Sequence, residues 1–204
     1  MASTAQRIRL RRATALPMVG AVSAALLSLS ASPASAAVAS CGANCTKFVA
    51  TAGIASGRAD AAAALSRTLS EVPRGWTVQL PPGTFRVSRP IRVPAGVTLA
   101  GSGMDNTVLL LDRRSWASFA YGFMVTGVGS KRTQGATTVR DLTINGNRVP
   151  VDSVGAGAKP RSNQGGGIRL SDGWTVTRVR FANLNYFRVW AKSVSNVTVS
   201  DSRF

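Results

Sequence analysis

Hydrophobic and polar positions change their period once along this chain. From Asp60 to Val72, apolar residues recur at helical spacing, with Leu65 and Leu69 on the same face as Val72, and this pattern predicts a helix. Asp60 stands where its side chain can cap the N-terminus of that helix, and the Pro-Arg-Gly sequence at residues 73–75 ends it. No second pattern of helical length follows.

After residue 75 the period becomes two. Short runs with alternate apolar positions, separated by Gly, Pro, Asn and Asp, predict a series of short strands. Examples are residues 77–80, 84–87, 91–93 and 97–99. Within these runs the apolar side chains are expected to point inward, whereas Arg92 and Thr98 point outward. One helix followed by many short strands indicates an all-β domain.

The late strands repeat. Residues 174–181 align with residues 197–204 at an offset of 23, and residues 139–144 align with residues 176–181 at an offset of 37. The Gly- and Pro-rich stretch 145–167 accounts for the difference and is expected to be an inserted loop. A repeat near 23 residues that holds several short strands suits one coil of a parallel β-solenoid, in which each coil buries its apolar face by stacking on its neighbours.

Several segments carry a family pattern. Residues 60–65 (DAAAAL) precede residues 78–87 (VQLPPGTFRV) and 91–103 (IRVPAGVTLAGSG), and residues 139–147 (VRDLTINGN) follow later. Together they resemble the pectate lyase-like superfamily, most closely its rhamnogalacturonase/epimerase-like branch. The resemblance implies an all-β, right-handed parallel β-helix whose N-terminal α-helix covers the first coil and its unpaired strand edges. Nothing after Phe204 could cap a last coil, so we expect the β-helix to be truncated at its C-terminus.

The N-terminus has the features of a secretory signal peptide. A basic region is followed by the apolar run 15–29 and by small residues at Ala34 and Ala36, which predicts cleavage after residue 36. We therefore divide the chain into a signal peptide (1–36), an N-terminal segment (37–58) and an incomplete β-helix domain (59–204). No second hydrophobic stretch is long enough for a transmembrane segment. The expected location is secreted and extracellular.

Two cysteines offer two interpretations of the mature N-terminus. A secreted chain favours a disulfide between Cys41 and Cys45. Alternatively, residues 38–41 resemble a bacterial lipobox, and the protein would then be lipid-anchored at Cys41. The apolar run ends well before Cys41, which favours the disulfide.

Composition excludes several kinds of chemistry. The sequence contains no His, so a Ser-His-Asp triad, a Cys-His pair and a His-ligated zinc site are excluded. There is no P-loop motif. With 25 Lys and Arg against 8 Asp and Glu, the net charge is +17, which favours an acidic partner. No nucleic-acid recognition motif accompanies this charge, so nucleic acid is not the expected partner.

Basic residues near the end of the chain form a candidate substrate-binding strip. The 23-residue offset stacks Arg180 under Arg203 and brings Arg169 near Lys192. Such a strip could bind the carboxylates of an acidic polymer such as a polyuronate. The alternative is a solvated face of outward-pointing charges, which is the more common explanation of such a charge run.

Candidate catalytic residues are harder to assign. The paired acids and the His-Gly motif of polygalacturonases are absent, so the catalytic residues stay unknown. Arg169, Lys192 and Asp172 are candidates by residue type and location. The resemblance adds that pectate lyases use an Arg as the base, which matches Arg169 in kind. Asp152 is another acid near the predicted loop.

Asp141, Arg178 and Asp201 occupy equivalent positions in three predicted coils. The resemblance makes Ca²⁺ a possible cofactor if the protein is a lyase, but Arg178 interrupts a column of acids. Asp and Asn tolerate left-handed backbone, so we expect a turn role here and no metal site. Trp174 aligns with the inward position of Val197 and is expected in the core, whereas Trp190 is left unassigned.

These inferences define one expected function and one alternative. The expected function is that of a secreted, polysaccharide-active β-helix protein: a polysaccharide lyase, glycoside hydrolase or epimerase acting on an acidic polysaccharide. The alternative is a non-catalytic extracellular module that binds glycans or serves as a surface protein. The sequence leans towards a carbohydrate-active enzyme without deciding that it is one.

Overall fold

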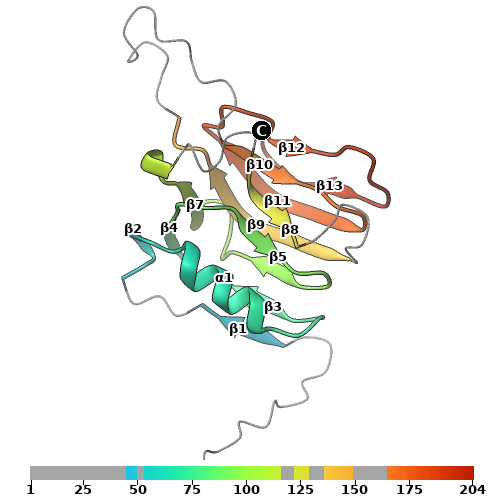
Figure 1. The fold of residues 1–204 in the computed structure, drawn as a ribbon, viewed down its shortest axis with the longest axis horizontal. Coiled ribbons are helices and arrows are strands. Elements are labelled where there is room, and N and C mark those ends of the chain that lie inside the picture. Colours follow the sequence, from blue (N-terminus) through green and yellow to red (C-terminus); the bar gives the residue numbers. More distant parts are fainter. Residues whose placement is uncertain (1–44, 50–52, 116–121, 129–135, 149–164) are drawn as a thin grey trace, which may run out of the picture. The chain divides into compact units, whose positions relative to one another are not determined.

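The computed structural model describes residues 45–49, 53–115, 122–128, 136–148 and 165–204, all within one compact unit that spans residues 40–204 (Figure 1). The predicted signal peptide, Cys41, Asp152 and most of the predicted inserted loop lie outside these residues. Every strand pairing in the described part is parallel. The predicted parallel β-helix is therefore confirmed.

Successive coils place their strands on three faces. Face one carries β1 (Thr46–Phe48), β3 (Thr77–Gln79), β6 (Thr98–Ala100), the first halves of β9 (Thr137–Asn145) and β11 (Trp174–Ala182), and β13 (Thr198–Ser200). Face two carries β2 (Ser56–Asp60), β4 (Gly83–Val87), β7 (Thr107–Leu111) and the second halves of β9 and β11. Face three carries β5 (Ile91–Val93), β8 (Phe123–Gly127), β10 (Gly166–Arg169) and β12 (Val189–Trp190). Strand pairing thus begins at Thr46, inside the segment that the sequence analysis separates from the β-helix.

Faces one and two join at a corner built from left-handed residues. Asp141 in β9 and Arg178 in β11 have φ angles of 59° and 50°, and Asp201 in the next coil has φ of 49°. Each residue turns the strand direction from face one to face two without breaking the pairing between β9 and β11. The predicted turn role of these residues is confirmed.

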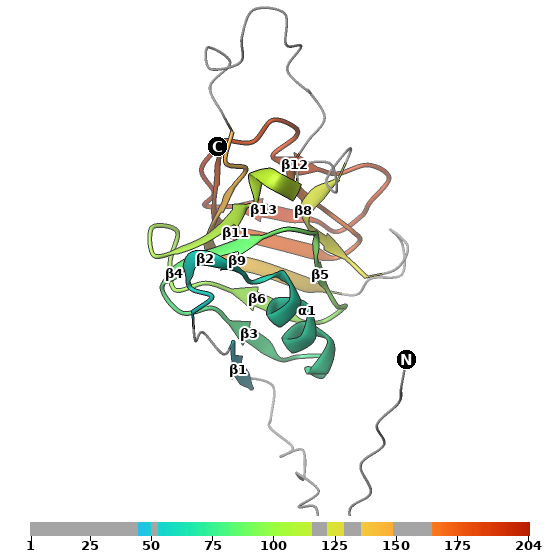
Figure 2. The ribbon, with the colours of Figure 1, turned by 60° about the vertical axis from the view of Figure 1, so that its left-hand side comes forward.

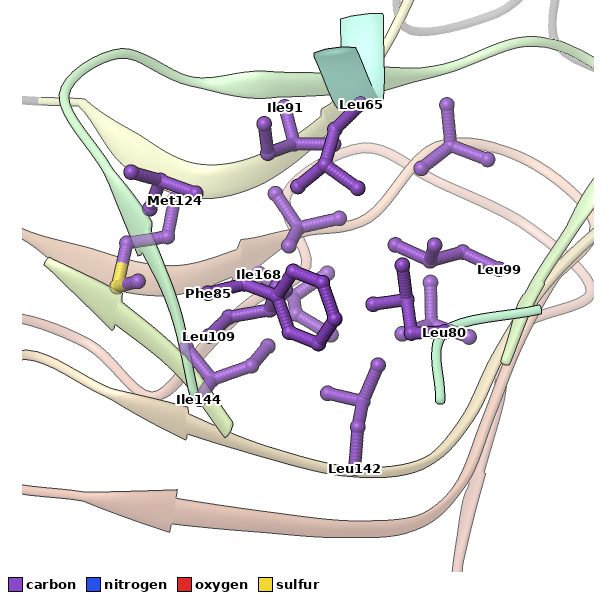
Figure 3. Close-up of a cluster of buried hydrophobic side chains, with 14 of the residues drawn as sticks. Leu65, Leu80, Phe85, Ile91, Leu99, Leu109, Met124, Leu142, Ile144 and Ile168 are labelled. Carbon is purple, nitrogen blue, oxygen red and sulfur yellow. The ribbon is translucent and has the colours of Figure 1, made fainter. Parts of the chain in front are cut away.

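The core follows the predicted alternation. Inward positions of all three faces and one face of the helix form a single buried cluster (Figure 3). Figure 3 shows Leu65 reaching into the same cluster as Phe85 and Ile91, and all three side chains are fully buried. Trp174 is also fully buried, as predicted. Removing this apolar surface from water is the main stabilising contribution to the coil stack.

The helix α1 (Ala62–Glu71) replaces a face-three strand in the first coil. It packs against β5, the end strand of face three, and so covers that sheet edge (Figures 1 and 2). Leu65 and Leu69 face inward, as predicted. The predicted N-cap is wrong, because Asp60 ends β2 and Ala61 is the N-cap residue. Asp60 still accepts the Ala62 N–H at 3.0 Å.

A column of threonines runs up the outside of face one. The pairing registers place one threonine of each coil beside that of the next: Thr46, Thr77, Thr98, Thr138, Thr175 and Thr198. The interior four are half-buried, and β-branched side chains pack well against their cross-strand neighbours. The column shows that the coils stay in register although their lengths differ.

Candidate functional site on face three

The outward side of face three carries a column of polar and aromatic residues. Arg92 in β5 pairs with Thr126 in β8, and Arg169 in β10 pairs with Trp190 in β12. The pairing of Ile168 with Val125 aligns these two halves. We call Arg92, Thr126, Arg169 and Trp190 the face-three column.

The spacing in this column follows from the sheet. Neighbouring strands lie about 4.8 Å apart, so the two arginine positions are about 10 Å apart, with Thr126 between them. The inward neighbours Ile91, Val125 and Ile168 are fully buried, which holds the backbone of the column on the rigid core. Arg92 is exposed and Arg169 is half-buried. Both guanidinium groups can therefore meet a ligand that lies across the strands.

Aromatic rings surround the Trp190 end of the column. Trp190 lies against Tyr186 with ring centroids 6.4 Å apart and an interplanar angle of 20°, and its centroid is 4.7 Å from that of Phe187. Phe123 of β8 contacts both Tyr186 and Trp190 and is itself buried, whereas Phe187 is 48% exposed. This aromatic cluster presents ring faces to solvent from an anchored base, which is suited to contact with the C–H face of a sugar.

The predicted basic strip is divided between two faces. Arg180 and Arg203 are bridge partners on face two, as their offset predicts. Arg180 already has a counterion there, because its Nη1 lies 3.3 Å from Oδ1 of Asp105. Arg169 lies on face three, where its register partner is Trp190 and not Lys192. The 23-residue offset does not hold on this face, so the prediction that Arg169 stacks near Lys192 is wrong.

The catalytic candidates are not assembled into a recognisable acid–base centre. Asp172 accepts the Ser195 N–H at 2.7 Å, which ties together the corners of two adjacent coils. Lys192 follows β12 and is exposed. Across the described ranges, no group of three or more His, Cys, Asp or Glu side chains is gathered in one place. The catalytic assignment of Arg169, Lys192 and Asp172 stays a prediction.

The Asp141–Arg178 corner does not suit Ca²⁺. Arg178 donates from Nε to Oδ1 of Asp141 at 2.5 Å and from Nη2 to Oδ2 at 3.0 Å, and Arg140 donates to Oδ2 at 2.6 Å. These hydrogen bonds, those from Arg178 foremost, lower the pKa of Asp141, and the same carboxylate raises the pKa of Arg178. Two guanidinium groups thus occupy the oxygens that a cation would need.

Part of the site was not foreseen from the sequence. Arg169 was singled out, but Phe123, Tyr186 and Phe187 were not, and Trp190 had no assigned place. The signal available in the sequence is the density of aromatic residues at 186–190 (Tyr-Phe-Arg-Val-Trp). Cys45 is buried, and because Cys41 lies outside the described residues the disulfide stays a prediction. In the described residues, no helix is both long and apolar enough to cross a bilayer.

The fold and the face-three column together define a parallel β-helix protein with an exposed basic and aromatic surface. Residues 44–169 match the family model described as "Rhamnogalacturonase A/epimerase, pectate lyase-like". This match covers more than half of the chain, so the chain belongs to that family.

Individual relatives agree with this assignment. The mannuronan C-5 epimerase AlgE6 A-module of Azotobacter vinelandii superimposes with a TM-score of 0.56 at 22% identity, over 76% of this chain and 42% of that chain. The AlgE4 A-module of the same organism gives a TM-score of 0.54 at 24% identity, over 76% of this chain and 43% of that chain. A curated relative, the pre-neck appendage protein of Bacillus phage B103, is 29% identical over 117 residues, which is 55% of this chain and 13% of that protein. This chain thus spans less than half the length of each of these proteins.

Proposed function

We propose that this protein is secreted and that face three binds an acidic polysaccharide. The observation that carries the proposal is the face-three column, in which two arginines and a tryptophan lie in register beside an aromatic cluster. Guanidinium groups pair with carboxylates, and aromatic faces stack on sugar rings, so this surface matches a polymer that has both. The family and the fold of the epimerase A-modules support the same substrate class, with mannuronan as the first polymer to test.

Secretion rests on the sequence of residues 1–36, which has the three parts of a signal peptide. The overall net charge of +17 suits a partner that carries many carboxylates. Edman sequencing of the exported protein tests this part of the proposal. A mature N-terminus at Val38 or Ala37 agrees with it, and a lipid-modified Cys41 contradicts it.

The reaction class we propose is that of a lyase, glycoside hydrolase or epimerase. All three act at a sugar ring held on a surface like face three, where arginines can stabilise negative charge that develops on the substrate. A second candidate is binding without turnover. It is favoured by the sequence, which has no His, and by the described residues, which gather no cluster of acids.

Binding is tested with the full-length secreted chain. Calorimetric titration measures the Kd for mannuronan, polygalacturonate and uncharged dextran. We expect both acidic polymers to bind more tightly than dextran. We expect Arg169→Ala and Trp190→Ala each to weaken the acidic polymers about tenfold, because each removes a direct contact.

Arg203→Ala is the matched control, since it removes the same charge from face two. It should change the Kd by less than about twofold once salt is present to screen long-range attraction. Equal losses for Arg203→Ala and Arg169→Ala would place the binding surface elsewhere. Turnover is followed on the same polymers: unsaturated uronate ends indicate a lyase, new reducing ends without them a hydrolase, and altered uronate stereochemistry by NMR an epimerase.

A further inference from the structure

A cavity of about 410 Å³ lies where α1 meets the first strand of face three. Its lining comes from the helix, from both ends of β5 and from the residue after β8: Ser66, Ser70, Arg89, Arg92, Pro94 and Val128. Arg92 belongs both to this cavity and to the face-three column. The cavity therefore continues the column at the end where α1 replaces a strand.

The two arginines of the cavity have no matched counterion among the described residues. No ion pair joins Arg89 or Arg92 to a carboxylate in that part of the chain. The acid whose charge Arg89 does influence is Asp60. Its carboxylate oxygens already accept hydrogen bonds from the Ser88 hydroxyl at 2.5 Å and from the Ser88 and Ala62 amides. Two guanidinium groups are thus available to an anion that enters the cavity.

The serines add acceptors to these donors. The Ser66 hydroxyl donates to the Ala62 carbonyl at 2.7 Å, and the Ser70 hydroxyl donates to the Arg67 carbonyl at 2.8 Å. Because each hydroxyl hydrogen is committed to the helix, each oxygen offers its remaining lone pair to a ligand. Pro94 and Val128 supply apolar surface in the same cavity.

We infer that this cavity is a terminal subsite that binds one uronate unit. A uronate has a carboxylate for the arginines, hydroxyl groups that donate to the serine oxygens, and a C–H face for the apolar wall. Inorganic phosphate would use the arginines alone. The inference rests on the proposed function, because it places the end of the bound polymer at the α1 end of the face-three column.

The test titrates monomeric mannuronate and galacturonate into ¹⁵N-labelled full-length protein, with methyl mannoside and inorganic phosphate at matched ionic strength. We expect both uronates to shift the amide signals of Ser66 and Ser70, and Arg89→Ala to weaken uronate binding about tenfold. Arg67→Ala removes the same charge from α1 outside the cavity, so it should leave the Kd within about twofold. Ser70→Ala should weaken uronate and leave phosphate unchanged.

Phosphate that binds as tightly as uronate, or an Arg67→Ala loss equal to that of Arg89→Ala, would overturn the subsite. The two proposals fail in different ways. Wild-type protein that binds the acidic polymers but not the monomers refutes the subsite and leaves the face-three proposal standing. Wild-type protein that binds neither acidic polymer refutes the face-three proposal.

Discussion

Replacing Asp141 separates two contributions to the stability of the corner between faces one and two. Asp141 holds a left-handed backbone, with φ of 59°, and its carboxylate pairs with both Arg178 and Arg140. Asn keeps the tolerance for that backbone and removes the charge, whereas Ala removes the charge and disfavours the backbone. The two substitutions therefore differ by the backbone contribution alone.

The magnitudes follow from exposure. The Asp141 side chain is 17% exposed, while those of Arg178 and Arg140 are 48% and 35% exposed, so solvent weakens both ion pairs. At about 0.5–1 kcal/mol for each such pair, Asp141→Asn should lower the free energy of unfolding by about 1–2 kcal/mol. Asp141→Ala adds about 1–2 kcal/mol for a left-handed residue other than Gly, Asn or Asp.

The pH dependence carries the sign of the Asp141 pKa. Hydrogen bonds from Arg178 lower that pKa below its ordinary value of 3.8, so the folded state prefers the ionised form. The stabilisation is therefore complete above the unfolded-state pKa and is lost as the pH falls through the lower folded-state value. The difference between wild type and Asp141→Asn should shrink below about pH 4, whereas the backbone cost of Asp141→Ala persists in acid.

Urea unfolding followed by circular dichroism, at neutral and acidic pH, measures these differences. Asp201→Asn is the matched control, because Asp201 has φ of 49° at the same corner and makes no ion pair within the described residues. It should change stability by less than about 0.5 kcal/mol. Equal stability of Asp141→Asn and wild type at neutral pH would refute the role of the ion pairs, and equal stability of the Asn and Ala variants would refute the backbone cost.

Three further comparisons use the same unfolding measurement. Gly101→Ala should cost about 3 kcal/mol or more, because the new Cβ would lie 2.3 Å from the carbonyl oxygen of Asp141, whereas Gly75→Ala, with φ of 85° and open space around it, should cost about 1 kcal/mol; equal losses would contradict the steric argument. Leu65→Ala should cost about 2–5 kcal/mol because Leu65 is fully buried, and a loss below 1 kcal/mol would mean that α1 does not seal the core. Trp174→Phe should stay within about 1 kcal/mol of wild type, because the smaller ring offsets its lost packing by removing a buried indole N–H that has no partner, and a loss above 3 kcal/mol would reject this balance.

Local features of the fold were readable from the sequence because they depend on short stretches of chain. The side-chain period of two identified the buried positions of β4, β5 and β11, and the period of the helix identified Leu65 and Leu69. The N-cap was misplaced by one residue because the Asp60 side chain is shared between the Ala62 amide and Ser88, which is 28 residues away. That second partner belongs to the next coil and leaves no mark on the local pattern.

The face-three column was only partly predictable for a related reason. An offset of 23 residues relates Thr175 to Thr198 on face one, but Arg169 and Trp190 on face three are 21 residues apart. The loops at the corners take up the difference, and their lengths change from coil to coil. A single offset therefore carried Arg180 to Arg203 correctly and Arg169 to the wrong neighbour.

By itself the sequence determined which side chains are buried, where the backbone turns left-handed, and that parallel coils stack on one another. These properties are local, since they come from alternation, from residue type and from the need of each coil to cover its apolar face. The tertiary structure alone decided which residues of different coils become neighbours. It placed Arg178 on Asp141, Trp190 beside Arg169, and α1 against β5 to form the cavity. Those contacts depend on loop lengths summed over a whole coil, which no short stretch of sequence encodes.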